Sequence, residues 1–145
     1  MNRIAIPLHH CRSRVPLVVF RTSDDRPRVG IVDTGSEVTM FDPSLIGNGM
    51  DATEGGGRTS FVGVNGEGDA GMVTRVSGTV GVRSKDGNDY DIPLSGVAYD
   101  CSNLSRIFSE RMDKEINVSM ILGSDFLKDR NSKIDFKKKT LTIDY

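Results

Sequence analysis

Short segments in which every second residue is apolar recur along this chain, and turn-forming residues separate them. Valine stands at positions 76, 80 and 82 of TRVSGTVGVRS, and Tyr90, Ile92 and Leu94 alternate in DYDIPLSGVAY. An alternation with period two places apolar side chains on one face of a β-strand. The turn signals SDDRP, NGEGDAG and DGND lie between such segments, so the strands are short. Many short strands at close spacing predict an all-β sandwich or barrel.

Helical periodicity is scarce, and the helix candidates are short. They cover 42–46, part of 103–114, and 124–130. A chain of 145 residues, 37% of them hydrophobic, suits one domain with one modest core. We therefore expect a single domain over residues 1–145.

Composition argues against several classes of function. The chain has 19 basic and 20 acidic residues, whereas a nucleic-acid surface usually needs a basic excess. No stretch approaches the ~20 apolar residues that span a bilayer, and the first ten residues lack the apolar region of a secretory signal. Two cysteines are too few for a disulfide framework, which favours a cytoplasmic protein; a product cut from a longer precursor would have the same features. His9 and His10 are adjacent, so on a strand they face opposite sides and cannot share a metal.

One acid stands between two apolar runs in GIVDTGSEVTMF, residues 30–41. The plain interpretation of Asp33, Thr34, Gly35 and Ser36 is a tight turn, because Asp and Ser bond to nearby backbone and Gly tolerates positive φ. A surface turn does not need apolar flanks, however. A buried strand that runs into Asp33 places its carboxyl at the edge of the core, where its pKa can be tuned. The flanks therefore favour a functional acid.

A second segment, MILGSDFL at 120–127, is followed by IDF and LTI. VDTGS followed later by these motifs resembles the single-domain, retroviral-type (retropepsin-like) aspartic peptidases and their cellular and bacterial relatives. The resemblance spans roughly Val29 to Tyr145. It implies an acid-protease-type closed barrel in which Asp33 is the catalytic acid and Ile121, Leu122 and Gly123 form a ψ-loop beside it. Ser124 stands where retroviral members often have Arg, so an ion pair built on that Arg cannot be carried over.

The middle of the chain fits the same family. Ser60 to Val76 reads as a hairpin with a glycine-rich tip, like the flap that such peptidases close over a bound peptide. Gly66, Glu67 and Gly68 would then contact substrate, and the glycines would let the tip bend. An ordinary loose hairpin has the same composition.

The chain has one Asp-Thr-Gly, whereas bilobed aspartic peptidases have two. A homodimer supplies the second acid, because a twofold axis would bring two Asp33 residues together. By resemblance, Thr34 locks the two turns together, Gly35 presents backbone to the substrate, and Ser36 donates to the Asp33 carboxylate. Asp125, the nearest rival acid, reads as a helix-opening or exposed residue. In many relatives terminal strands pair across the axis, and TLTIDY has the alternation for that.

The sequence therefore predicts a homodimeric aspartic endopeptidase that hydrolyses peptide or protein substrates and needs neither metal nor cofactor. A non-catalytic binding or dimerisation module with the same fold is the alternative. A third interpretation is an unrelated β-barrel in which DTGS is only a turn.

Overall fold

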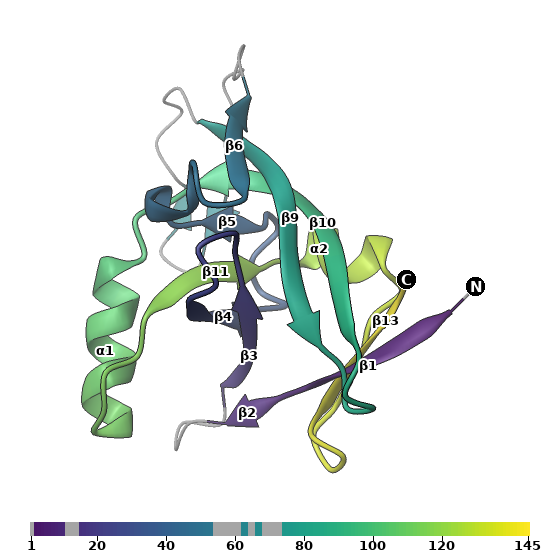
Figure 1. Ribbon diagram of the computed structural model, residues 1–145. Helices are drawn as coiled ribbons and strands as arrows, with labels where there is room; N and C mark the ends of the chain where they lie inside the picture. The colour runs from purple at the N-terminus through teal and green to yellow at the C-terminus, as the bar shows by residue number, and fades with distance from the viewer. Residues whose placement is uncertain (1, 11–14, 54–61, 64–65, 68–73) are drawn as a thin grey trace.

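A computed structural model describes residues 2–10, 15–53, 62–63, 66–67 and 74–145. Six strands form a closed β-barrel in the order β3-β4-β11-β5-β10-β9 (Figure 1). Their bounds are β3 Pro16–Arg21, β4 Pro27–Val32, β5 Met40–Phe41, β9 Arg75–Arg83, β10 Asp89–Ala98 and β11 Val118–Leu122. β9 closes the ring on β3 through one residue pair, Arg21 with Gly81. The predicted all-β barrel is confirmed.

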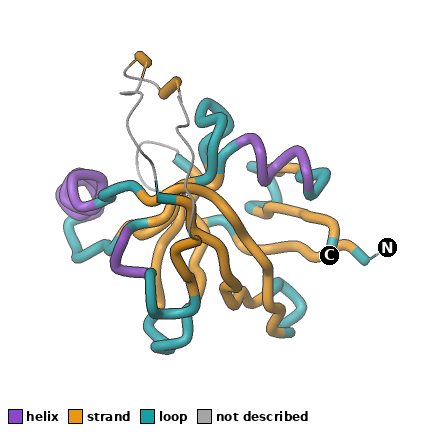
Figure 2. The backbone as a smooth tube through the Cα atoms, turned by 90° about the horizontal axis from the view of Figure 1, so that it is seen from above, coloured by secondary structure: helices purple, strands orange, loops and turns teal. Residues whose placement is uncertain are grey.

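Smaller strands extend or flank the barrel. β2 (His9–His10) pairs with the start of β3, and β6 (Met50–Thr53) pairs with β9. A separate three-stranded sheet has the order β1-β13-β12, with β1 Arg3–Pro7, β12 Lys133–Asp135 and β13 Thr140–Asp144. β7 (Val62–Gly63) and β8 (Gly66–Glu67) pair with each other and lie outside the barrel in Figure 2.

The helices are few and short, as the sequence predicts. They are the 3-10 turn η1 (Pro43–Leu45), α1 (Ser102–Met112) and α2 (Ser124–Asp129). None of the described helices is long and apolar enough to cross a membrane.

The main core fills the barrel and continues under the three-stranded sheet. The largest fully buried side chains are Phe20, Phe41, Leu45, Met50, Ile92, Met120, Leu141 and Ile143. The alternation seen in the sequence explains this, because Val76, Val80 and Val82 of β9 all turn inward with Ile92 and Leu94 of β10. Burial of these faces supplies most of the driving force for folding.

α1 packs on the outside of the barrel over a second apolar cluster. Phe108, with Leu104 and Met112 one turn away on each side, contacts a cluster that includes Ile31 and Val118. Hydroxyl groups of α1 also bond to the chain that enters β11. Val118 N donates to Ser105 Oγ (2.9 Å), and Ile116 N donates to Ser109 Oγ (2.9 Å). Because both of its faces are covered, β11 is buried along its whole length and reads as a continuous apolar run.

Candidate active site

The Asp33 turn leaves the barrel at the end of β4. Asp33 N donates to Leu122 O (3.0 Å), and Ser36 N donates to Asp33 O (3.2 Å), which closes the turn. Gly35 N donates to one oxygen of the Asp33 carboxylate (2.9 Å). Among the described residues, the other carboxylate oxygen has no hydrogen-bond donor. The Asp33 side chain is half-buried while Thr34 and Gly35 are exposed, so the carboxylate is fixed by backbone and still accessible.

β11 holds this turn from the inside. It pairs in parallel with β4 (Leu122 with Val32) and antiparallel with β5 (Ile121 with Met40). The chain therefore passes from β4 through the Asp33 turn to β5 on the far side of β11. This brings Ile121 and Leu122 beside the turn, as expected, and both are buried in apolar clusters. Their role is to form the core beneath the acid.

Gly123 follows β11 where the two segments touch most closely. A Cβ at this position would lie 2.6 Å from Val38 C and O and 2.9 Å from Ser36 O. Ser124 N, the next backbone amide, donates to Ser36 O (2.7 Å). Only glycine allows this approach, because no real Cβ tolerates such distances to backbone.

Asp125 has a role that the sequence prediction missed. Its carboxylate accepts hydrogen bonds from Thr39 N (3.1 Å) and Thr39 Oγ1 (2.7 Å), besides one from Phe126 N at the start of α2. Thr39 Oγ1 in turn accepts from Gly123 N (3.1 Å). Asp125 therefore joins α2 to the segment that leads from the Asp33 turn into β5. The one signal in the sequence was that Thr39 is a polar residue within the apolar run VTMF. The structure shows that it is fully buried.

Ser36 does not donate to the Asp33 carboxylate, which corrects the expected hydrogen bond. Its hydroxyl donates to Val38 O (2.8 Å), and the residue is buried. A hydroxyl readily bonds to backbone two residues away. The carboxylate receives its donor from Gly35 N instead. Ser36 supports the turn rather than the acid directly.

The expected flap residues are found only in part. Gly66 and Glu67 form β8, in which Gly66 pairs with Gly63 and Glu67 with Val62. The pair lies within the segment predicted to form the flap, but it places Gly66 and Glu67 in a strand and not at the tip. Gly68 lies outside the described residues.

A cavity of about 650 Å³ lies beside the turn. It is lined by Thr34, Gly35 and Glu37 on one side and by Ser124, Leu127, Lys128, Asn131 and Ser132 on the other. The Ser132 hydroxyl is buried and has no hydrogen-bond partner within the described part of the chain. The exposed tip of the Asp33 turn thus borders a hollow that reaches to the start of β12.

The described residues contain no group of three or more His, Cys, Asp or Glu side chains that could hold a metal ion. No protein-family model matches the chain, and none of the curated proteins is significantly similar to it.

Proposed function

We propose that this protein is an aspartic endopeptidase that acts as a homodimer. The observation that supports this most is the Asp33 carboxylate, which stands at the open end of a buried strand and is oriented by the Gly35 amide (2.9 Å). A plain surface turn would not need three elements, β4, β11 and the chain leading into α2, to hold it. Such fixing is what an acid or base with a set orientation requires.

The mechanism needs two carboxylates. Two Asp33 side chains about 3 Å apart would not both ionise readily, so the pair would share one proton. The ionised carboxylate takes a proton from a water, which attacks the peptide carbonyl carbon. The protonated carboxyl donates to the carbonyl oxygen. Thr34 and Gly35 are exposed at the tip, and in the proposed dimer they would meet the second turn and the substrate.

We also propose a more specific type for the barrel. The passage of the chain around β11, from β4 to β5, is the connectivity of a ψ-loop. We assign the barrel to the acid-protease type on this ground, together with the turn sequence. The β7–β8 pair then takes the role of the flap, with Gly66 and Glu67 in its second strand.

The dimer that we propose does not use the C-terminal strand, which the sequence suggested. β13 lies between β1 and β12 of its own chain, so both of its edges are occupied. Within the described structure, β12 pairs only with β13, so it is an edge strand. It is the edge of this sheet nearer the Asp33 turn, because Asn131 and Ser132, just before β12, border the same cavity as Thr34. Two β12 strands paired antiparallel about a twofold axis at Ile134 would place Lys133 of each subunit opposite Asp135 of the other.

The test of the activity is cleavage of an unfolded protein between pH 4 and 7 by wild type and by Asp33→Asn. We expect the substitution to abolish cleavage while folding and dimerisation persist, since Asn keeps the size and hydrogen bonding but cannot share the proton. Asp51→Asn, at an exposed position on β6, is the matched control and should cleave normally. Cleavage by Asp33→Asn at the wild-type rate would contradict the proposal. A dimer that cleaves nothing would favour the non-catalytic module.

A further inference from the structure

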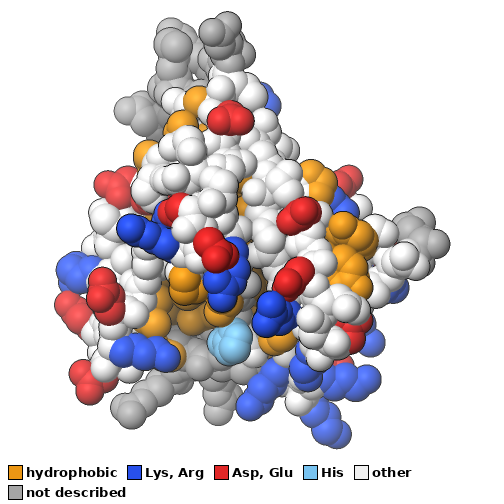
Figure 3. Space-filling model, in the orientation of Figure 1, with side chains coloured by type: hydrophobic (Ala, Val, Ile, Leu, Met, Phe, Trp, Pro, Cys, Tyr) orange, Lys and Arg blue, Asp and Glu red, His pale blue; other side chains and the backbone are white. Residues whose placement is uncertain are grey.

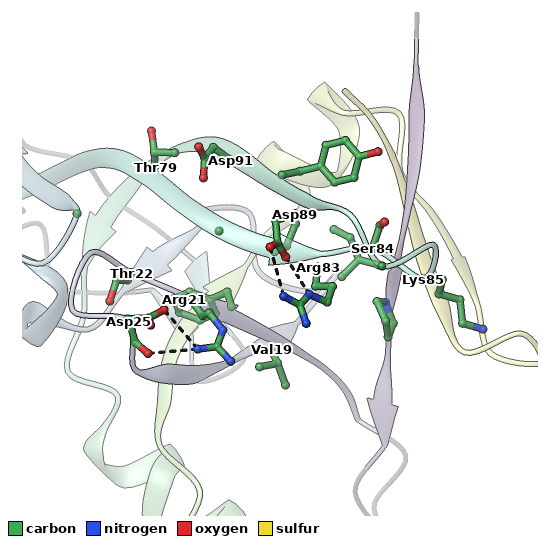
Figure 4. A pocket seen from close by; sticks show the side chains of 18 of the residues that line it. Val19, Arg21, Thr22, Asp25, Thr79, Arg83, Ser84, Lys85, Asp89 and Asp91 are labelled. Carbon is green, nitrogen blue, oxygen red and sulfur yellow. Dashed lines mark hydrogen bonds and ion pairs between the residues drawn. The ribbon is translucent and has the colours of Figure 1, made fainter.

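Two cavities of this protein differ in how their charged side chains are satisfied. The larger, of about 1120 Å³, is bordered by β3, β9 and β10 and lies away from the Asp33 turn. Figure 3 shows it as a hollow with charged side chains around an apolar floor. Both of its arginines have an acidic partner within the chain, since Arg21 pairs with Asp25 and Arg83 pairs with Asp89 (Figure 4). These arginines therefore need no partner from a second molecule.

The smaller cavity, of about 650 Å³ beside the Asp33 turn, contains charges that are not paired. Glu37 and Lys128 are the only charged side chains among the described residues that line it. Glu37 follows the turn, Lys128 lies on α2, and both are exposed. Neither has an ion-pair partner in the described part of the chain. The cavity therefore carries one acid and one base, which stand apart on its two sides.

A buried hydroxyl at the same cavity also lacks a partner. Ser132 Oγ is buried and makes no hydrogen bond within the described structure, although buried polar atoms in proteins nearly always make one. Ser132 borders the cavity together with Leu127, an apolar residue that is only 7% exposed. A polar group from a second molecule could satisfy this hydroxyl. The cavity thus has the features of a surface that another molecule covers.

The position of the cavity points to a second copy of the chain as that molecule. The dimer proposed above uses the Asp33 turn and the edge strand β12. Thr34 and Gly35 at the tip of the turn and Ser132 just before β12 all border the cavity. A dimer that uses both contacts therefore also covers the cavity between them.

Covering the cavity sets a condition on its two charges. A charge that loses water without gaining an opposite charge is costly. In an isologous interface both subunits present the same surface, so a contact from residue i to residue j of the other subunit is repeated from j to i. One acid and one base on this surface can therefore satisfy each other twice across the twofold axis.

We propose that Glu37 of each subunit forms an ion pair with Lys128 of the partner subunit, so that two equivalent pairs close the two cavities of the dimer. The inference rests on the proposed function for the existence of the dimer. It gives these side chains a separate role, because they determine how the two Asp33 turns meet and take no part in proton transfer. The competing arrangement is an ion pair within one chain, formed by a change of side-chain conformation.

Charge reversal tests the proposal. In Glu37→Lys each subunit presents two bases at the cavity, and in Lys128→Glu it presents two acids, so like charges meet twice in each dimer. Each variant should raise the dimer dissociation constant, measured by analytical ultracentrifugation, by about tenfold or more, since two exposed ion pairs are lost. Lys114→Glu and Glu115→Lys change exposed residues outside the cavity. They are the matched controls and should dimerise as wild type.

A mixture of Glu37→Lys and Lys128→Glu shows whether the pairs join two subunits. In a heterodimer one subunit contributes two basic side chains and the other two acidic ones, so both contacts again join opposite charges. Heterodimers should therefore form with about the wild-type dissociation constant. Recovery only in the double variant would indicate a pair within one chain and overturn the proposal. Unchanged dissociation constants in the single variants, or a wild type that is monomeric at every concentration, would also overturn it.

The same measurements separate this inference from the peptidase proposal. If the dissociation constants follow the expected pattern but the wild-type dimer cleaves no peptide, the pairing stands and the peptidase proposal fails. If wild type cleaves and both single variants dimerise as well as wild type, the pairing fails and the catalytic role of Asp33 is not contradicted.

Discussion

At the scale of single residues, backbone contacts dominate the candidate site. The Asp33 carboxylate takes its hydrogen bond from the Gly35 amide, and the Asp33 and Ser124 amides bond to carbonyl groups across the turn. Gly123 has no side chain, which allows two backbone segments to come close. The Ser36 side chain bonds to the backbone carbonyl of Val38. The position of the acid therefore depends on how closely two chain segments approach each other.

Replacing Gly123 by Ala should push these segments apart. Its Cβ would lie 2.6 Å from the Val38 carbonyl, and backbone cannot yield as a flexible side chain can. We expect the free energy of unfolding to fall by about 1–3 kcal/mol, as is usual for overpacking, measured by urea denaturation. Gly81→Ala is the control, because its Cβ would make contacts no shorter than 3.8 Å. Equal stability losses in the two variants would contradict this account.

A second residue-scale prediction concerns Asp24 and acid. The Thr22 hydroxyl, the Arg26 amide and the Arg28 guanidinium, in that order of effect, lower the pKa of Asp24 from 3.8 to about 2. The folded state thus favours the ionised carboxylate, so the contribution to stability is present above pH 4 and disappears as pH falls from 3.8 toward 2. Asp24→Asn should lose stability relative to wild type at pH 5, and the difference should shrink at pH 2. If the free energies of unfolding of wild type and Asp24→Asn differed by the same amount at pH 5 and pH 2, this contribution would be ruled out.

How much of the site could be read from sequence depends on the range of the interactions. Asp33 was identifiable because its apolar neighbours, Ile31 and Val32 before it and Met40 and Phe41 after it, form a local pattern. The bond from Thr39 to Asp125 joins residues 86 positions apart, and no local pattern reports such a partner. The hydroxyl of Ser36 had two acceptors within reach, and only the backbone geometry decides between Asp33 and Val38.

At the scale of elements, the same distinction applies. β9 and β10 alternate clearly, and the structure forms both with their apolar residues inward. β11 is buried on both faces, so its apolar run did not by itself tell where it would pair. The alternation in TLTIDY correctly predicted a strand, but this strand pairs within its own chain and not with a second subunit as expected. Leu141 and Ile143 are fully buried in their own chain, because β1 and β12 flank this strand.

The β12 edge gives a prediction at this scale. In the proposed antiparallel pairing, Lys133 faces Asp135 of the other subunit, so Lys133→Glu should weaken the dimer through like-charge repulsion. Adding Asp135→Lys should restore it, since the reversed charges are again complementary. Dimer dissociation constants from analytical ultracentrifugation measure both effects. Asp135 also accepts from Lys138 N (2.9 Å), so Asp135→Asn serves as a control for the loss of that bond.

An unchanged dissociation constant in Lys133→Glu would place the dimer interface elsewhere on the molecule. It would not contradict the proposed catalytic role of Asp33, because that role requires only that two turns meet.

At the scale of the whole molecule, each chain holds half of the proposed site. The barrel places one Asp33 turn at its surface, with exposed Thr34 and Gly35 and a cavity beside them. An active molecule then needs two chains, with the turns at the centre of an isologous interface. Activity should fall faster than in proportion to concentration once the protein is diluted below its dimer dissociation constant.

Mixing wild-type and Asp33→Asn subunits tests this claim most directly. After subunit exchange, shown by co-purification of a tagged subunit, an equal mixture contains wild-type homodimers as about one quarter of all dimers by random pairing. Peptidase activity should therefore fall to about half of that of the same amount of wild type alone, and further with more mutant. Activity that stays proportional to the wild-type protein, despite exchange, would place both catalytic groups in one chain and contradict the account.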